Sequence, residues 1–234
     1  EHSYLLSCDY SQIELRILAH ISGDKNLCAD FRENKDIHKL TASLIYHLDE
    51  KEVTEEMRDV AKRVNFAIVY GLSAFGLSRD LGIPFEEAQS FIDSYFLRYP
   101  GVKDYIQHQI LLAQKNGFVT TILGKRRYIP EINEKNTTIK EFAKRKAINT
   151  PIQGSASDLI KLAMVSIHRE IKDKGFKARM VLQIHDELLF DVPKDEVKQI
   201  IAIVRMKMEN VLKLDVPIRV DIKMGQNWLE MEPV

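Results

Sequence analysis

Apolar residues recur along the chain with two different spacings. Some segments have the spacing of β-strands, and others have the three-to-four-residue spacing of helices. The strand-like segments near the chain ends are residues 4–10, 178–184, 188–192 and 218–224. The second and third of these flank the polar triplet His185-Asp186-Glu187 and predict a hairpin. Residues 118–130 predict another hairpin, with its turn at Gly124-Lys125.

Helical periodicity dominates the middle of the chain. Predicted helices span residues 11–23, 55–70, 84–96, 101–116, 139–151, 155–172 and 195–212. Ser11 and Glu14 have the spacing of a capping box at the first helix, and Thr54 suits the N-cap of the second. Strands and helices do not alternate as in βαβ units, which favours an α+β fold. We expect a small antiparallel sheet from the chain ends, with a mostly helical lobe inserted between them.

Composition places the chain among ordinary globular proteins. Of its 234 residues, 45% are hydrophobic and 29% are charged, which excludes intrinsic disorder. No segment approaches the ~20 apolar residues of a membrane helix, so no membrane partner is expected. Cys8 and Cys28 are too few for a disulfide framework, so we expect a reducing, cytoplasmic location. Because the chain begins with Glu1 rather than methionine, we expect it to be part of a longer protein.

Charge is balanced overall but segregated along the chain. The 34 lysines and arginines equal the 34 aspartates and glutamates in number. Residues 125–146 nevertheless carry eight bases and three acids, and residues 186–234 carry ten acids and seven bases. A basic stretch beside an acidic zone suits a nucleic-acid surface next to a metal site. Taken alone, the pattern favours the simpler interpretation of solvated surface.

Acidic side chains mark the ends of two predicted strands. Asp9 closes the first strand, where an isolated acid is usually a turn or cap residue. Asp186 and Glu187 stand at a hairpin tip, where ordinary polar turn residues are again the simpler interpretation. If the first strand pairs beside this hairpin, Asp9 and Asp186 converge at one end of the sheet. Converging carboxylates repel one another, and a set of oxygen ligands favours magnesium or manganese over zinc.

The helix predicted over residues 55–70 carries a second pattern. The side chains that recur at every fourth residue are Arg58, Lys62, Phe66 and Tyr70. Together they cover ~120° of one helix face. An amphipathic core helix would simply leave Arg58 and Lys62 in water, and this interpretation stays open beside a functional one. In the functional interpretation, the guanidinium, the ammonium and the aromatic rings recognise a triphosphate and its sugar in order.

Four segments, in order, resemble motifs of the family A DNA polymerases. They are DYSQIELR at residues 9–16, RDVAKRVNFAIVYG at residues 58–71, NTPIQG at residues 149–154 and IHDE at residues 184–187. The resemblance extends over the whole chain and implies a palm-and-fingers architecture. It implies that the palm contains residues 1–14 and 155–234 and that the fingers contain residues 15–154. Counterparts of the thumb, the upstream palm strands and an exonuclease domain are not expected in this segment.

The resemblance also implies a template-directed DNA polymerase, which transfers deoxynucleoside monophosphate from a dNTP to a primer 3′ hydroxyl. Asp9 and Asp186 match the family's metal ligands, so two magnesium ions are the expected cofactors, with manganese as an alternative. Glu187 matches an auxiliary carboxylate. Lys62 matches a residue that neutralises charge and protonates the departing pyrophosphate.

Further matching positions are expected to contact the substrates. Arg58 and His38 are expected at the outer phosphates of the dNTP, and Lys62 at the reacting one. Glu14 and Phe66 are expected to wall off the ribose 2′ position. The remaining matches are Tyr70 near the template base, Gln12 at the dNTP site and the duplex, and the primer–template contacts Arg145, Asn149, Gln153 and His185.

Two interpretations from other classes stay open, namely a DNA-binding remnant without chemistry and a two-metal nuclease. The nuclease has little use for a phosphate-binding helix that ends in two aromatic rings. Because the thumb and upstream palm strands are missing, we expect this segment alone to bind DNA weakly and to polymerise poorly or not at all. The missing strands also leave a sheet edge unpaired, which allows an edge-strand dimer.

Overall fold

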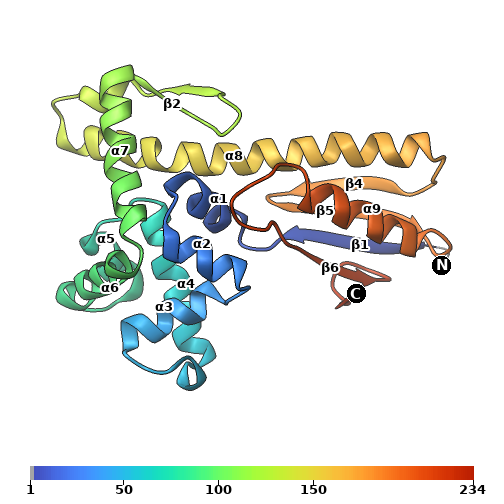
Figure 1. Ribbon diagram of the computed structural model, residues 1–234, viewed down its shortest axis with the longest axis horizontal. Coiled ribbons are helices and arrows are strands. Elements are labelled where there is room, and N and C mark those ends of the chain that lie inside the picture. Colours follow the sequence, from blue (N-terminus) through green and yellow to red (C-terminus); the bar gives the residue numbers. More distant parts are fainter. Residues whose placement is uncertain (1–2) are drawn as a thin grey trace. The chain divides into compact units, whose positions relative to one another are not determined.

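The computed structural model describes residues 3–234 and divides them into two compact units. The unit that we call the sheet unit contains residues 3–14 and 156–234. The unit that we call the helical unit contains residues 15–155. Figure 1 labels the elements of both units along the chain.

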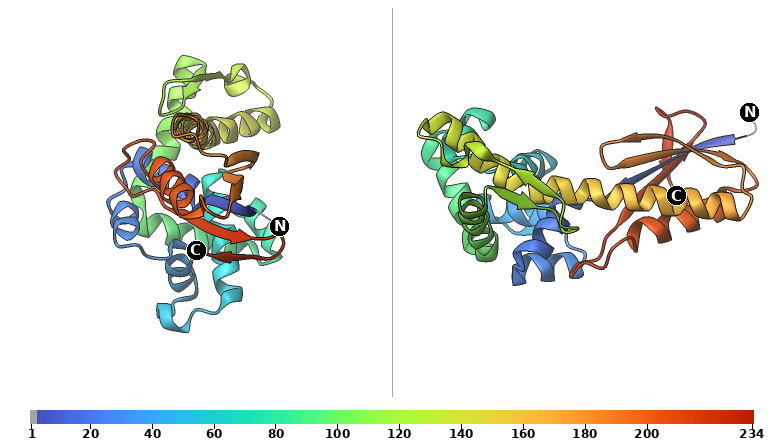
Figure 2. Two further views of the ribbon diagram at one scale, coloured as in Figure 1. Left: turned by 90° about the vertical axis from the view of Figure 1, so that its right-hand side faces the viewer. Right: turned by 90° about the horizontal axis from the view of Figure 1, so that it is seen from above.

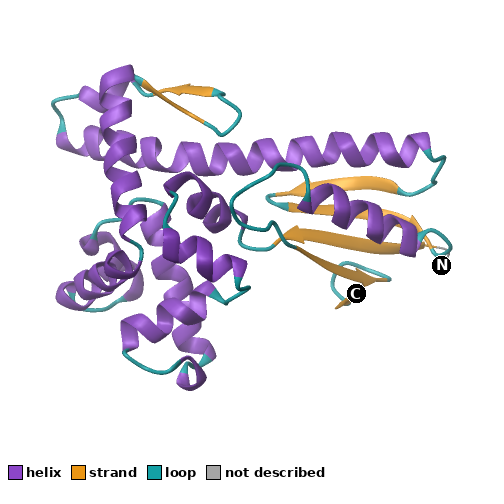
Figure 3. Cartoon of the chain, in the orientation of Figure 1, coloured by secondary structure: helices purple, strands orange, loops and turns teal. Residues whose placement is uncertain are grey.

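A five-stranded antiparallel sheet, in the order β4-β5-β1-β6-β7, forms the core of the sheet unit. Its strands are β1 (Ser3–Tyr10), β4 (Arg179–Ile184), β5 (Glu187–Pro193), β6 (Val220–Gly225) and β7 (Met231–Pro233). The strand from the start of the chain, β1, lies between β5 and β6 from its end. The prediction of an α+β fold with a small antiparallel sheet from the chain ends is confirmed, whereas β7 was not predicted (Figure 3).

The two faces of β1 have different environments. Helix α9 (Val197–Glu209) packs against one face, where the Tyr10 hydroxyl donates a hydrogen bond to the Met208 carbonyl oxygen at 3.0 Å. Leu6 shares that face because side chains alternate along a strand, and it is buried. Ser7 and Asp9 therefore lie on the opposite face of the sheet.

Helix α8 (Thr137–Asp173) is one helix of 37 residues and is continuous in the views of Figures 1 and 2. The prediction of two helices separated at Pro151 was wrong. A proline inside a helix costs ~3 kcal/mol because it removes one N–H donor and crowds the preceding turn. Its neighbours Ile148 and Ile152 are only 4% and 0% exposed. Burying each isoleucine stabilises the packed helix by ~1.5–3 kcal/mol, which is enough to offset the proline.

The helical unit consists mainly of helices. Its helices are α1 (Ile13–Ser22), α2 (Lys25–Arg32), α3 (Ile37–Tyr46), α4 (Glu55–Val69), α5 (Ala74–Leu81), α6 (Phe85–Arg98), α7 (Pro100–Asn116), the first part of α8, and the 3-10 helices η1 (Glu50–Glu52) and η2 (Pro130–Asn133). A hairpin of β2 (Phe118–Thr120) and β3 (Arg126–Tyr128) completes it. The predicted hairpin and the helices α4, α6 and α7 are confirmed, and α2, α3 and α5 were not predicted individually.

The start of α1 differs from the predicted capping box. A capping box would place Gln12 in the first helical position, but its φ of 53° is left-handed and the helix begins at Ile13. Hydrogen bonds to the sheet unit explain why helix α1 begins later in the sequence than predicted. The backbone N–H of Tyr10 donates to the Asp186 carbonyl at 3.3 Å, and that of Ser11 donates to the Arg219 carbonyl at 2.9 Å. These bonds hold the chain in an extended path past the point where the helix was predicted to start.

Helix α4 has the ends that its sequence predicts. The Thr54 hydroxyl accepts a hydrogen bond from the Met57 N–H at 3.3 Å, and Gly71 follows the helix with a φ of 65°. A Cβ atom on Gly71 would lie 2.8 Å from Cδ1 of Ile148, so both conformation and space require glycine there. Helix α4 is thereby fixed against α8 within the helical unit.

Strand β4 forms one edge of the five-stranded sheet and exposes Val181 and Leu182. An unpaired edge with apolar side chains is a site where another strand can add. The edge-strand dimer stays a prediction. Within residues 3–234, no helix is both long enough and apolar enough to span a bilayer.

Candidate active site

A row of carboxylates crosses the three central strands of the sheet. Asp9 on β1 lies directly opposite Glu187 on β5 and directly opposite Asp221 on β6. Residues that are directly opposite in an antiparallel sheet project from the same face. Three carboxylates from distant parts of the sequence therefore form one line. Sequence reasoning missed Asp221, because only the pairing register of β6 brings it beside Asp9.

Asp186 joins this row from the hairpin turn between β4 and β5. Ile184 pairs with Glu187, so the turn consists of His185 and Asp186. His185 has a φ of 54°, the left-handed conformation that a two-residue hairpin turn requires. The side-chain amide of Gln183 donates to the His185 carbonyl oxygen at 2.8 Å. The expected pairing of the first strand beside this hairpin is confirmed, and it brings Asp186 to the same end of the sheet as Asp9.

The clustered carboxylates disfavour ionisation of Asp9. Partial desolvation raises the pKa of Asp9 to about 6, and the negative charges of Asp186, Glu187 and Asp221 add to this effect. Lys223 opposes it but does not cancel it. The residue still reaches solvent, so the carboxylate is accessible to a ligand. Like charges directly opposite in a sheet are destabilising, and a bound cation removes that repulsion.

Glu187 is oriented by two donors. Its Oε1 atom accepts a hydrogen bond from the Ser7 hydroxyl at 2.6 Å and another from the Trp228 indole N–H at 3.3 Å. Both donors lie in the sheet unit, one on β1 and one between β6 and β7. Sequence reasoning missed Ser7 and Trp228, although Ser7 precedes Asp9 by two residues and so shares its face.

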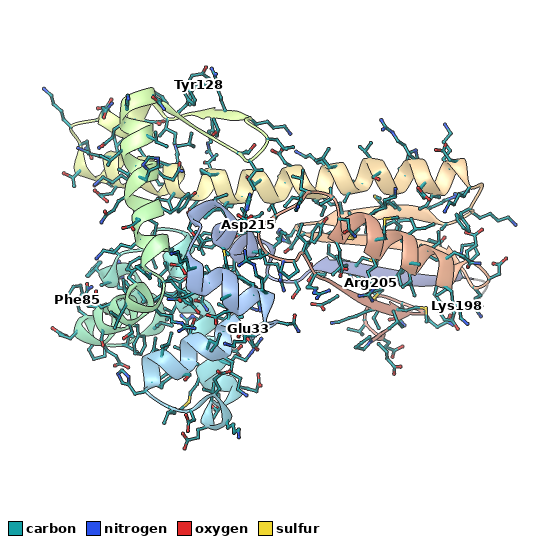
Figure 4. The ribbon with its side chains drawn as sticks, in the orientation of Figure 1. Glu33, Phe85, Tyr128, Lys198, Arg205 and Asp215 are labelled. Atoms are coloured by element: carbon teal, nitrogen blue, oxygen red, sulfur yellow. The ribbon has the colours of Figure 1, made fainter. Side chains whose placement is uncertain are left out.

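An open groove of about 550 Å³ lies in the sheet unit beside the carboxylate row. Side chains that line it include Ser7, Asp9, Glu187, Asp221, Lys223 and Arg205, the last labelled on α9 in Figure 4. No group of three or more His, Cys, Asp and Glu side chains within residues 3–234 is placed to hold a metal ion. Magnesium commonly uses only one or two carboxylates and keeps several waters, so two aspartates supply enough oxygen ligands for this ion. The oxygen-only donor set equally disfavours zinc.

One face of α4 carries the second predicted group. Arg58, Phe66 and Tyr70 are partly exposed and Lys62 is exposed, whereas Val64 and other side chains of the opposite face are buried. The rings of Phe66 and Tyr70 have centroids 5.9 Å apart. The regular spacing predicted from the sequence therefore produces a continuous surface of two cations and two aromatic rings.

Arg58 is held by the end of the neighbouring helix. Its Nε atom lies 2.7 Å from Oδ2 of Asp36, and Oδ1 of Asp36 accepts the backbone N–H groups of His38 and Lys39 at 3.0 and 3.1 Å. Burial opposes ionisation of Asp36, but the Arg58 hydrogen bond and the Lys39 N–H keep its pKa below the ordinary value. Asp36 thus caps α3 and orients Arg58 at once. Sequence reasoning missed it, although an Asp two residues before His38 is an N-cap signal.

His38 lies buried between α3 and α4. Its ring centroid is 6.0 Å from that of Phe66. Burial lowers the pKa of His38 to about 4, Asp36 opposes the shift, and the positive charges of Arg58 and Lys62 add to it. The imidazole is therefore neutral at pH 7. The structure places His38 near Arg58, Lys62 and Phe66.

The positions matched to DNA contacts are distributed over both units. Arg145, Asn149 and Gln153 follow one another at every fourth residue of α8 and share a face of that helix. Within the described residues, Oδ1 of Asn149 and Oε1 of Gln12 are buried acceptors without a hydrogen-bond donor. Such orphaned acceptors are costly, and a ligand that donates a hydrogen bond satisfies them.

The basic stretch is only partly free to bind an anion. Lys144 pairs with Glu141 at 2.6 Å and Lys146 with Glu131 at 3.6 Å. In the β2–β3 hairpin, Tyr128 is 67% exposed (Figure 4). Arg127 donates a hydrogen bond to the Thr150 hydroxyl at 3.2 Å, and the Arg126 and Arg145 guanidinium groups lie over the rings of Phe118 and Phe142.

Comparisons with known proteins agree on one family. The family described as DNA polymerase family A matches residues 1–230. DNA polymerase I of Bacillus subtilis (strain 168) is 49% identical over 226 residues, which cover 97% of this chain and 26% of that protein. The thermostable DNA polymerase I of Thermus filiformis is 46% identical, with 97% of this chain and 27% of that protein covered.

A solved structure is similar over the same length. The polymerase domain of Pol1 from M. smegmatis, in complex with DNA primer-template and dNTP, has a TM-score of 0.94 and 43% sequence identity. The match covers 97% of this chain and 40% of that one. The chain therefore spans about a quarter of the length of the curated relatives it matches.

Proposed function

The chain belongs to DNA polymerase family A, and on that premise we propose that it forms the palm and fingers of a template-directed DNA polymerase. The proposed reaction transfers deoxynucleoside monophosphate from a dNTP to the 3′ hydroxyl of a primer. The sheet unit corresponds to the proposed palm and the helical unit to the proposed fingers. The proposed location is the cytoplasm, where both substrates occur.

One observation carries the proposal, namely the convergence of Asp9 and Asp186 beside Glu187 and Asp221. Such an array of carboxylates raises its own electrostatic energy and has no evident value for the fold. It suits the binding of divalent cations, which a phosphoryl-transfer enzyme needs next to its anionic substrate.

Asp9 and Asp186 are the proposed ligands of two magnesium ions, for which manganese is a substitute. When bound, the ions would lower the pKa of the primer hydroxyl and neutralise charge on the triphosphate. Glu187 accepts hydrogen bonds from Ser7 and Trp228, which supports an auxiliary role beside the two aspartates.

The proposed triphosphate site uses the cationic face of α4. Arg58 and His38 bind the outer phosphates, and Lys62 neutralises charge that develops on the leaving pyrophosphate and donates a proton to it. Preorganised charge is most effective here, since it needs no rearrangement as the negative charge moves. The Asp36 contact supports this assignment because it holds Arg58 in place before any ligand is present.

Selection of the sugar and contact with DNA use the remaining positions. Glu14 and Phe66 are proposed to exclude a ribose 2′ hydroxyl, and Tyr70 to lie near the template base. Gln12 is assigned to both the dNTP site and the duplex. The other proposed duplex contacts are Arg145, Asn149, Gln153 and His185. Minor-groove acceptors vary little between base pairs, so such contacts sense duplex shape and tolerate any sequence.

A chimera tests the proposal. This chain replaces the matching segment of Bacillus subtilis DNA polymerase I, which supplies the parts of the relative that lie outside the match. We expect the chimera to lengthen a labelled primer with magnesium and dNTPs, according to the template. The chain alone is expected to do so slowly or not at all, because the proposed thumb and upstream palm strands contribute to DNA binding.

Three outcomes separate the proposal from its rivals. Template-directed lengthening by the chimera supports a polymerase. Shortening of the primer by the chain or the chimera supports a two-metal nuclease. Retention of the duplex by a folded chimera without any change in primer length supports a binding module, and either of the last two results contradicts the proposal.

A further inference from the structure

Three buried polar side chains form a chain of hydrogen bonds between α3 and α4. Thr41 and Asn65 are 0% exposed and His38 is 3% exposed. The Thr41 hydroxyl donates to Oδ1 of Asn65 at 3.0 Å, and Nδ2 of Asn65 lies 2.9 Å from Nδ1 of His38. A buried polar group without a partner costs ~1–3 kcal/mol. Each member of the chain is therefore held in its orientation by the next.

The direction of these bonds determines where the His38 proton lies. Because the Thr41 hydroxyl donates to the amide oxygen, the amide nitrogen of Asn65 faces the imidazole. An amide nitrogen can only donate, so Nδ1 of His38 must accept. A neutral imidazole has one proton, which then resides on Nε2.

The surroundings of His38 suit a neutral donor. Arg58 and Lys62 act on the imidazole with positive charge, Asp36 and Asp59 act with negative charge, and Phe66 packs beside it. Burial is the largest effect, and it disfavours a positive charge on the imidazole. A neutral N–H group adds a hydrogen bond beside two cations at no such cost. The described hydrogen bond of the imidazole uses Nδ1, which leaves the Nε2–H group as the donor for a ligand.

We propose that Asn65, held by Thr41, is a positioning residue that fixes His38 as the Nε2–H tautomer, so that His38 donates a hydrogen bond to a phosphate of the bound nucleoside triphosphate. The phosphate contact rests on the proposed function. The tautomer rests only on the buried hydrogen-bond chain. Two faces of helix α4 thus contribute to triphosphate binding. Arg58 and Lys62 act directly, and the buried Asn65 acts through His38.

Nitrogen NMR of the unmodified chain tests the tautomer without any substitution. Long-range proton–nitrogen spectra of the chain with 15N-labelled histidine distinguish a protonated from an unprotonated ring nitrogen. The His38 signals are identified by their loss in the His38→Gln variant. We expect Nδ1 without a proton and Nε2 with one at pH 7. A protonated Nδ1 in the unmodified chain overturns the inference.

The Asn65→Asp variant tests the cause of the tautomer. It keeps the size of the side chain and the acceptor for Thr41, but it replaces the N–H donor with an acceptor. We expect the proton of His38 to move to Nδ1. The Thr41→Ser variant keeps the hydroxyl donor and is expected to leave the tautomer unchanged. An unaltered tautomer in Asn65→Asp means that Asn65 does not set it.

Binding of magnesium–dATP tests the phosphate contact through a double-mutant cycle. We expect Asn65→Asp to weaken binding about 10-fold when His38 is present. In the His38→Gln background the same change is expected to cost less than about 2-fold, since the glutamine amide donates without a tautomer. Simple repulsion by the new carboxylate would weaken binding equally in both backgrounds, and that result overturns the inference.

The two proposals fail in different ways. If the unmodified chain does not bind magnesium–dATP, the proposed triphosphate site is wrong and the phosphate contact of His38 falls with it. If the chain binds magnesium–dATP but the cycle shows no coupling between Asn65 and His38, only the inference is wrong.

Discussion

The carboxylate row of the sheet unit and the cationic face of α4 satisfy their charges in opposite ways. On α4, Arg58 already has Asp36 as a partner, and Asn65 contacts the buried His38 of α3. Across β5, β1 and β6, by contrast, Asp9 faces two further carboxylates, and within the described residues none of the three forms an ion pair. The helical unit is therefore organised before a ligand arrives, whereas the sheet unit remains electrostatically incomplete until a cation binds.

The two sites are encoded in different ways along the chain. The α4 face comes from one periodic segment and one neighbouring helix, so its partners are local. The carboxylate row comes from strands that only the sheet register brings together. We therefore expect substitutions in the row to abolish chemistry, and substitutions among the supporting contacts of α4 to weaken substrate binding.

The largest effect is expected from the row itself. In the chimera, Asp9→Asn and Asp186→Asn should each lower the rate of nucleotide addition at least ~10³-fold, because metal binding supplies several kcal/mol of transition-state stabilisation. The rate is measured by single-turnover primer extension. The exposed Asp104 of α7 gives the control Asp104→Asn, which should retain full activity. A loss below ~10-fold in either row variant would mean that the reaction does not depend on the carboxylate row.

The next effect is expected on α4. Lys62→Ala should lower kcat by ~10²-fold, the usual consequence of removing one charged donor from a developing anion. Adjacent Arg63 points to the other side of the helix and pairs with Asp80 at 2.9 Å, so Arg63→Ala is the matched control. Equal losses in the two variants would mean that net charge, rather than the position of Lys62, is responsible.

A smaller effect, on dNTP binding, should follow when the contact that orients Arg58 is removed. Asp36→Asn keeps a good N-cap for α3 but removes the charge that holds the guanidinium, so dNTP binding should weaken ~10-fold. Calorimetry with magnesium–dATP provides the measurement. Asp80→Asn breaks the other Asp–Arg contact on α4 and should change binding by less than ~2-fold. Similar losses in both would show that Asp36 has no special role in orientation.

The smallest effect concerns stability without metal. Because the folded pKa of Asp9 is raised to about 6, its contribution to stability is fully present below its ordinary pKa of 3.8 and is lost as pH rises through about 6. In EDTA at pH 8, Asp9→Asn should therefore raise the free energy of unfolding by up to ~1 kcal/mol, a figure reduced for solvent screening. At pH 3 the gain should vanish. Urea unfolding that shows a destabilised variant at pH 8 would contradict the repulsion.

Much of the fold was predictable where a local signal is strong. Thr54 and Gly71 mark both ends of α4, and the triplet from His185 marks the β4–β5 turn. The short helices α2 and α3 were missed although Asp24 and Asp36 cap them, because eight to ten residues give too little periodicity. Pro151 predicted a break in α8, but burial of the neighbouring side chains keeps the helix continuous. Such burial cannot be predicted from the local sequence.

The candidate site was predictable for a different reason. Resemblance to a family singled out Asp9 and Asp186, and the expected pairing of the first strand beside the hairpin predicted their convergence. Asp221 and Trp228 depend on the register of β6 and on a loop after it, neither of which the sequence specifies locally. Asn65 carries a detectable signal, since it is a polar residue on the apolar face of α4.

Manganese binding to the chain shows whether the carboxylate row holds a divalent cation. Electron paramagnetic resonance measures free Mn²⁺ as the chain is titrated at pH 7.5. We expect Asp9→Asn and Asp186→Asn each to weaken binding by ~10-fold or more, whereas Asp104→Asn should bind like the unmodified chain. Equal binding by all four proteins would contradict this expectation and show that the carboxylate row does not hold the cation.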